Sequence, residues 1–108
     1  MKLTMKKIFV LFLMVLMTSL SFSQNIEKTV CPVMAINGSK DSQVLSSLNL
    51  PAIKKELPEN HKDLIKEYPG MNHLFQVCTT GLPDEYVKIE NTISVRVLED
   101  MVHWINQL

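Results

Sequence analysis

Two polar residues follow apolar stretches of the sequence, and their types suit proton-transfer chemistry. Asp41 ends the turn after the apolar run 29–37, and His73 follows the Pro-Gly turn after a second predicted strand. An aspartate that accepts the Nδ1 proton of a histidine fixes its tautomer and leaves Nε2 free to take a proton from a nucleophile. Asp41 and His73 are therefore the candidate acid and base if the fold brings them together.

Each of these two residues also has an ordinary structural interpretation. Aspartate is common in polar turns, where its carboxylate accepts hydrogen bonds from nearby backbone N–H groups, and spacing alone favours this interpretation for Asp41. A partly buried turn histidine is the corresponding alternative for His73. The other histidines, His61 in a charged loop and His103 beside Trp104, are interpreted as surface residues.

The elements that must position these residues alternate between strand and helix. The short apolar run 29–37 is typical of a strand buried on both faces, and residues 63–68 form a weaker second strand. Between them, residues 48–57 predict a helix with Pro51 in its first turn and Pro58 after its end. This order predicts two parallel strands joined by a right-handed crossover, so that both strands end at the same edge of one sheet.

The segment after the second strand predicts two more helical stretches. An acidic first turn at residues 83–85 begins one of them, in which apolar residues recur at helical spacing up to Ile93. Ser94 is expected to cap a final amphipathic helix. The apolar stripe of that helix consists of Val97, Met101, Trp104 and Leu108.

A different topology remains open at Asn37-Gly38, because this dipeptide is a strong hairpin signal. Under that interpretation, residues 40–45 would pair antiparallel with the first strand. Asp41 would then have no catalytic meaning.

The N-terminal residues predict an export signal. Residues 1–23 contain three lysines, the apolar run 8–17 and a small-residue pattern that ends at Ser23, as in a secretory signal peptide cleaved after that residue. An uncleaved membrane anchor is the alternative, but the apolar run is shorter than the roughly 20 residues that a bilayer span needs. We expect a signal peptide at 1–23, a short linker at 24–29 and a single domain at 30–108, in a secreted or periplasmic protein.

Composition excludes several classes of function. The 108 residues carry 11 basic and 11 acidic side chains, and the part after Ser23 keeps 8 basic and 11 acidic ones, a net charge of −3. That balance disfavours nucleic acid and anionic membrane as partners. The three glycines, Gly38, Gly70 and Gly81, lie too far apart for a Gly-x-Gly-x-x-Gly loop, a Walker A loop or a Gly-x-Ser-x-Gly nucleophile elbow.

The two cysteines, Cys31 and Cys78, would be exported into an oxidising compartment, and composition alone allows one disulfide between them. Neither has a cysteine or histidine partner at zinc-ligand spacing. A copper site built from Met34, Met71 and His73 is disfavoured, because methionine at such positions usually fills a core. No metal or other cofactor is expected.

The sequence around these candidates resembles secreted α/β-hydrolase-fold serine esterases of the carboxylesterase and dienelactone-hydrolase type. Residues 31–44 (CPVMAINGSKDSQV) resemble the strand and acid loop of that family, and residues 50–53 (LPAI) its crossover helix. Residues 69–76 (PGMNHLFQ) are similar to its catalytic histidine loop, and residues 80–86 (TGLPDEY) to its closing segment. The resemblance runs in the family's chain order over residues 30–108.

The resemblance implies a fold and a set of roles. The fold class would be α/β: the last two parallel strands of an α/β-hydrolase fold, their crossover helix and a C-terminal helix. Asp41 resembles the triad acid and His73 the triad base, in the family's order. Asn72 and Phe75 would help to aim the imidazole, and Gly70 would supply a backbone conformation that a Cβ resists. Cys31 and Cys78 would lie about a strand length apart, too far for a disulfide, and stay free.

The departure from the family concerns the nucleophile. The family's elbow and oxyanion-hole loop belong to its earlier part, and none of Ser39, Ser42, Ser46 and Ser47 stands in an elbow pattern. We therefore expect a C-terminal hydrolase segment for carboxylic esters that is inactive alone and takes a small ester substrate only when complemented. The alternative is a non-enzymatic secreted binding or assembly module, which would bind a protein or itself through an exposed strand edge.

Overall fold

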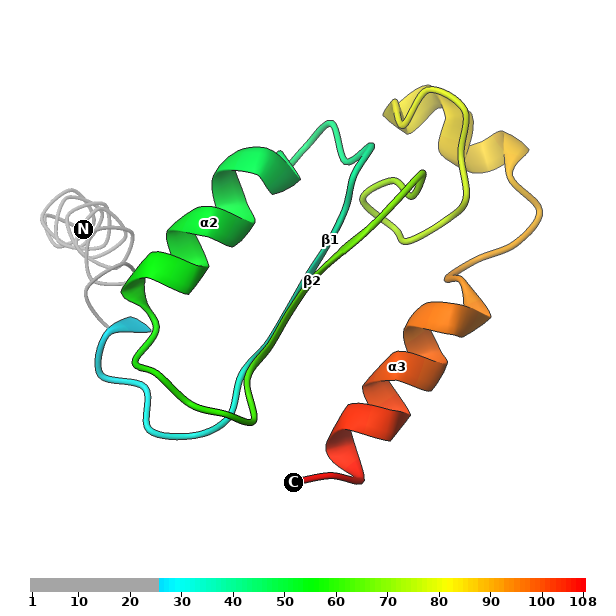
Figure 1. Cartoon of the computed structure of the whole chain (residues 1–108). Coiled ribbons are helices and arrows are strands. Elements are labelled where there is room, and N and C mark those ends of the chain that lie inside the picture. The colour runs from blue at the N-terminus through cyan, green and yellow to red at the C-terminus, as the bar shows by residue number, and fades with distance from the viewer. Residues whose placement is uncertain (1–25) are drawn as a thin grey trace, which may run out of the picture. The chain divides into compact units, whose positions relative to one another are not determined.

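The computed structural model describes residues 26–108, so the predicted signal peptide at 1–23 and the start of the predicted linker at 24–29 lie outside the described residues. Residues 31–55 and 59–108 form one compact unit. It holds, in chain order, the elements labelled in Figure 1, together with a short 3-10 helix. None of the helices in the described part is long and apolar enough to cross a membrane.

Two short parallel strands form the sheet of this unit. β1 (Met34–Gly38) pairs with β2 (Leu64–Tyr68) in a register that runs from Met34 opposite Leu64 to Gly38 opposite Tyr68. The connection between them contains the helix α2 (Ser46–Glu56), as a parallel pair requires. The predicted parallel pair with a crossover helix is confirmed, and the hairpin at Asn37-Gly38 is wrong, because β1 pairs with β2 rather than with residues 40–45.

The first strand and the crossover helix differ from their predicted bounds. β1 is shorter than the predicted strand at 29–37, because pairing with β2 begins only where the Leu64 N–H donates to the Val33 carbonyl oxygen at 2.9 Å. α2 begins at Ser46 rather than at residue 48, since the carbonyl of Leu45 already accepts helical hydrogen bonds. The proline at 51 therefore lies inside the helix and not in its first turn.

The C-terminal helices follow the prediction in part. The stretch from residue 83 forms a 3-10 helix η1 (Pro83–Lys88) that ends well before Ile93, so the longer helix predicted there is wrong. The predicted final helix forms as α3 (Val95–Ile105), with Ser94 at its N-cap position, but it ends before Leu108, which was expected in its apolar stripe. The Ser94 hydroxyl makes no capping hydrogen bond, but its backbone N–H donates to the Phe75 carbonyl oxygen at 2.9 Å.

A helix lies on each face of the sheet, as Figure 1 shows for α2 and α3. On the α2 face, the Ser46 hydroxyl donates to the Glu67 carboxylate at 2.5 Å. On the α3 face, Asp100 accepts hydrogen bonds from the Tyr68 hydroxyl at 2.7 Å and the Lys66 ammonium at 2.6 Å. Alternate residues of β2 thus attach the sheet to different helices, as the two-residue period of a strand requires.

The core of the unit lies between the sheet and α3. Tyr68 and Val97 are fully buried, Met71 is nearly so, and these three side chains pack together. The Tyr68 and Phe75 rings meet edge to face with centroids 5.9 Å apart. Partly buried apolar side chains complete the cluster: Ile36, Phe75, Ile93 and Met101. The strand end that carries Tyr68 and the loop that carries Phe75 are therefore held by the same core.

Candidate functional site

The loops that leave the carboxyl ends of β1 and β2 are hydrogen-bonded to each other. The Ser39 N–H donates to the Tyr68 carbonyl oxygen and the Lys40 N–H to the Met71 carbonyl oxygen, both at 2.9 Å. At Gly38 the loops come so close that a Cβ atom would overlap the Met71 carbonyl oxygen. Glycine at this position therefore permits the approach of the acid loop to the histidine loop.

The acid loop is also held by the segment that follows the histidine loop. The Ser42 hydroxyl donates to the Gly81 carbonyl oxygen and the Gln43 amide to the Tyr86 hydroxyl, each at 2.9 Å. Gly81 itself has φ +78°, and a Cβ there would overlap the Lys40 carbonyl oxygen. Three separate segments of the chain therefore converge around Asp41.

Asp41 and His73 are in direct contact. The Nδ1 atom of His73 lies 2.8 Å from the Oδ2 atom of Asp41. The Asp41 side chain is 4% exposed and the His73 side chain 38% exposed. Within the described residues, the Nε2 atom of His73 has no hydrogen-bond partner. The imidazole is thus held at Nδ1 by a buried carboxylate, while its other nitrogen is open to an incoming group.

The carboxylate of Asp41 accepts four hydrogen bonds. Its Oδ1 atom accepts from the backbone N–H groups of Gln43 at 2.9 Å and Val44 at 2.8 Å, in an Asx-type turn. Its Oδ2 atom accepts from the Asn37 amide at 3.1 Å as well as from His73. Both interpretations of Asp41 therefore correspond to observed contacts. The Oδ1 atom makes the backbone contacts of a turn aspartate, and the Oδ2 atom makes the contact with His73.

These contacts control the pKa of the Asp41 carboxyl. Burial alone would raise that pKa, but the Val44 N–H, the His73 ring and the Gln43 N–H together outweigh burial and hold it below its ordinary value. The charged carboxylate is the form that donors stabilise. Asp41 is therefore ionised at neutral pH and serves as a fixed acceptor for His73.

The depressed pKa of Asp41 predicts a loss of stability in acid. Because the folded state lowers this pKa, the carboxylate stabilises the fold above the unfolded value near 3.8, and the contribution disappears as the pH falls through the folded value. Urea unfolding from pH 6 down to pH 2 should show this fall in the free energy of unfolding. An Asp41→Asn variant should lose part of the slope, whereas Asp84→Asn, which removes an exposed carboxylate, should keep it. If the free energy of unfolding fell equally steeply with pH in the wild type and in Asp41→Asn, the lowered pKa of Asp41 would be contradicted.

The histidine loop is built around Asn72. The side chain of Asn72 is fully buried, and its oxygen accepts hydrogen bonds from the backbone N–H groups of Leu74 at 2.9 Å and Gln76 at 3.1 Å. Its side-chain nitrogen donates to the side-chain oxygen of Gln76 at 2.9 Å. The Gln76 amide in turn donates to the Asn91 carbonyl oxygen at 3.1 Å. Asn72 thereby fixes the backbone on both sides of His73, which gives a physical basis for its expected part in aiming the imidazole.

Two residues of the histidine loop have left-handed backbone conformations. Gly70 has φ +73° with open space where a Cβ would stand, so conformation rather than crowding favours glycine there. Phe75 has φ +56°, which is uncommon for an aromatic residue. Its ring packs on Tyr68 and its carbonyl accepts from Ser94, and these contacts offset the backbone cost.

Sequence reasoning missed two residues that support this site, Asn37 and Gln76. Both are buried polar side chains, 3% and 6% exposed. The signal for Asn37 is an amide at the end of an otherwise apolar strand, because a buried amide needs hydrogen-bond partners. Gln76 had no comparable signal, since its partner Asn72 becomes evident only from the shape of the loop.

No nucleophile contacts His73 within residues 26–108. The Ser39 hydroxyl accepts from the Gly70 N–H, and the Ser42 and Ser46 hydroxyls donate elsewhere. Cys31 is exposed and Cys78 half-buried, and both are free thiols. Burial and the Glu85 carboxylate raise the pKa of Cys78, which disfavours its thiolate. Among the described residues, the site therefore consists of a carboxylate and an imidazole in contact, with no hydroxyl or thiol hydrogen-bonded to the imidazole.

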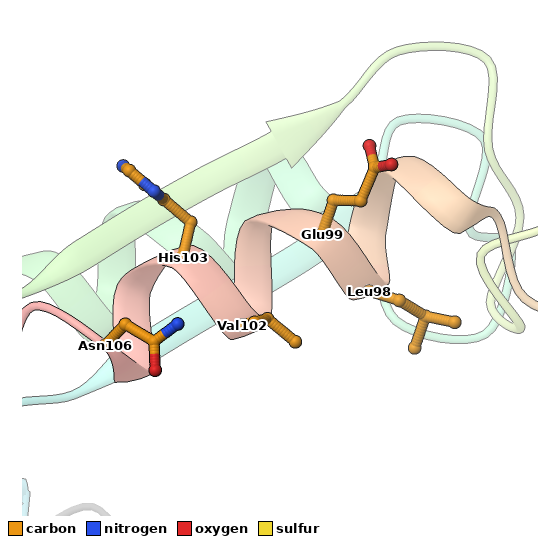
Figure 2. Close-up of a pocket in the computed structure, with 5 residues that line it drawn as sticks. All are labelled: Leu98, Glu99, Val102, His103 and Asn106. Carbon is orange, nitrogen blue, oxygen red and sulfur yellow. The ribbon is translucent and has the colours of Figure 1, made fainter.

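A separate shallow groove lies on α3. It has a volume of about 380 Å³ and is lined by Leu98, Glu99, Val102, His103 and Asn106. Figure 2 shows Leu98 and Val102 pointing away from Glu99 and His103 on the same helix. Neither Asp41 nor His73 lines it. The part of the chain that the structure describes also contains no group of three or more His, Cys, Asp or Glu side chains arranged to hold a metal ion.

Comparison of the chain with protein-family models, with curated proteins and with solved structures found no match.

Proposed function

We propose that this chain is the acid–histidine segment of an exported serine hydrolase for carboxylic esters, and that it is inactive until another polypeptide supplies the nucleophile. The observation that carries the proposal is the 2.8 Å contact between the buried Asp41 carboxylate and Nδ1 of the half-exposed His73. It is the contact by which a triad acid orients its base. The finer assignment of the two-stranded sheet, as the last strands of an α/β-hydrolase fold, is part of the same proposal.

In the completed enzyme each residue would have one role. A serine hydroxyl supplied by the partner would attack the acyl carbon of the ester as Nε2 of His73 takes its proton. Asp41 would stabilise the resulting imidazolium through Nδ1 and remain ionised. Collapse of the tetrahedral adduct would break the ester C–O bond, and the proton on Nε2 would go to the departing alkoxide. Water would then release the acyl group by the same route.

The free edge of β1 supports a partner that completes the sheet. The Leu64 N–H donates to the Val33 carbonyl oxygen, and the Ser39 N–H donates to the Tyr68 carbonyl oxygen. Because backbone groups alternate in direction along a strand, every second residue from 33 to 39 directs its N–H and C=O toward β2. Met34 and Ile36 therefore direct theirs toward the opposite side, where no strand of the described residues pairs with them. A parallel strand added there would end next to Asp41 and His73, at the edge where a nucleophile is needed.

An ester-hydrolysis assay tests the proposal. The purified chain should hydrolyse p-nitrophenyl acetate no faster than its His73→Ala variant, because general-base action without a nucleophile or oxyanion donors contributes little. His103→Ala, which removes an exposed imidazole, is the matched control. Hydrolysis by the isolated chain that disappears only in His73→Ala would overturn its inactivity while supporting the role of His73.

Complementation tests the positive half of the proposal. Co-expression with a polypeptide from a neighbouring reading frame that carries a Gly-x-Ser-x-Gly elbow should yield a stoichiometric complex with esterase activity. Removal of Asp41 or His73 should reduce that activity by at least about 10³-fold, as expected for a triad member. A complex whose activity is unchanged in His73→Ala would contradict the assignment.

A second candidate function, a non-enzymatic secreted binding or assembly module, is favoured by the same unpaired edge of β1. Size-exclusion chromatography with light scattering separates the two. A folded complex that stays intact and inactive, and whose affinity is unaffected by His73→Ala, would favour the module. Loss of binding after Met34→Pro, which removes an outward N–H from β1 at a residue outside the core cluster, would identify the edge as the interface.

A further inference from the structure

Asn37 connects the acid of the site to the scaffold. It is the fourth residue of β1 and its side chain is 3% exposed. Its amide nitrogen donates to Asp41 Oδ2 at 3.1 Å and to the Val44 carbonyl oxygen at 3.0 Å. Its amide oxygen accepts from the Asn49 side chain of α2 at 2.8 Å. All the polar atoms of this buried side chain are thus used, and one of its bonds goes to the carboxylate that holds His73.

The orientation of the Asn37 amide follows from its partners. The Val44 carbonyl oxygen can only accept, so the NH₂ group must face it, and the second N–H then points at Asp41. Reversing the amide would place its oxygen against the Val44 oxygen and the Asp41 carboxylate. The bond to Asp41 is therefore built into the end of β1.

We propose that Asn37 is a positioning residue that holds Asp41 Oδ2 in place for His73; this inference rests on the proposed function. The Asx turn fixes only the other oxygen, Oδ1, about which the carboxylate could still pivot. Asn37 meets Oδ2 from a second direction, so the oxygen that faces His73 Nδ1 is restrained independently of His73. The neutral imidazole is thereby kept as the Nδ1–H tautomer, which leaves the lone pair of Nε2 free for a nucleophile's proton.

Nitrogen-15 NMR of the histidine ring in the full chain tests this role. Asn37→Ala should lower the ratio of Nδ1–H to Nε2–H tautomer of neutral His73 by about tenfold, the change expected when one hydrogen bond to a charged group is lost. Asn49→Ala is the matched control, because it removes a part-buried hydrogen bond to the same amide but leaves both donors of Asn37 in place. It should leave the tautomer ratio unchanged, even where both variants lose similar stability.

A wild-type measurement covers the case in which Asn37→Ala does not fold. The side-chain amide proton of Asn37 that faces Asp41 should change its chemical shift as His73 is titrated, because the same carboxylate oxygen accepts from both residues. An unchanged tautomer ratio of His73 in Asn37→Ala would overturn the positioning role. So would a chemical shift of the Asn37 amide proton that stays constant while His73 is titrated. Neither readout requires catalysis, so an inactive complemented enzyme would count against the proposed function and not against this inference.

Discussion

Asp41→Asn should invert the tautomer of His73 and destabilise the fold by about 3 kcal/mol. The oxygen of the new amide must stay with the N–H groups of Gln43 and Val44, which only donate. Its NH₂ group must then face His73 Nδ1 and the Asn37 amide nitrogen. The imidazole would accept at Nδ1 and carry its proton on Nε2, and the two amide groups would oppose each other as donors inside the protein.

The inverted tautomer removes the base from the site, because a protonated Nε2 cannot take a proton from a nucleophile. Ring nitrogen-15 shifts report the tautomer, and urea unfolding at pH 7 reports the stability. Asp84→Asn serves as the control, since it removes the same charge from an exposed position of η1 and should change neither quantity. A His73 that keeps its Nδ1–H tautomer in Asp41→Asn would contradict the assigned contact.

Tyr68→Ala should unfold the compact unit at room temperature. Its fully buried ring packs with Met71 and Val97 and meets Phe75 edge to face, so truncation removes the centre of the core cluster. Loss of a large buried aromatic side chain costs about 3–5 kcal/mol, a large share of the stability of a domain this small. Circular dichroism and urea unfolding of the purified variant measure the effect.

Tyr68→Phe separates the ring from its hydroxyl. Only the 2.7 Å hydrogen bond to Asp100 is lost, and Asp100 keeps its contact with Lys66. The expected cost is about 1 kcal/mol, and the unit should remain folded. Burial and the Asp100 carboxylate raise the pKa of Tyr68, so its hydroxyl stays a donor at neutral pH. If Tyr68→Ala were no less stable than Tyr68→Phe, the packing of the core would be refuted.

Local signals predicted the elements better than their ends. The apolar runs and the turn residues placed both strands, the crossover helix and the final helix in the right order. Their bounds differed from the prediction where particular hydrogen-bond partners decide them, on another strand for β1 and directly before the helix for α2. β1 is short because β2 offers only five residues for pairing, and α2 starts early because Leu45 accepts its first hydrogen bonds. The helix predicted up to Ile93 ends at Lys88, where the chain turns toward the core that Ile93 joins.

The residue types of the site can be read directly from the sequence, and so can the absence of a Gly-x-Ser-x-Gly pattern from these 108 residues. The intervening helix between two short apolar runs favoured a parallel pair with Asp41 and His73 after its strands, but the hairpin at Asn37-Gly38 was excluded only by the observed pairing of β1 with β2. The 2.8 Å contact between the two side chains, and the contact of Asn37, 4 residues before Asp41, with the same carboxylate, become evident only in the folded chain. Strand order follows from local patterns, whereas hydrogen bonds between loops 32 residues apart depend on the register of the sheet and on the close approach at Gly38.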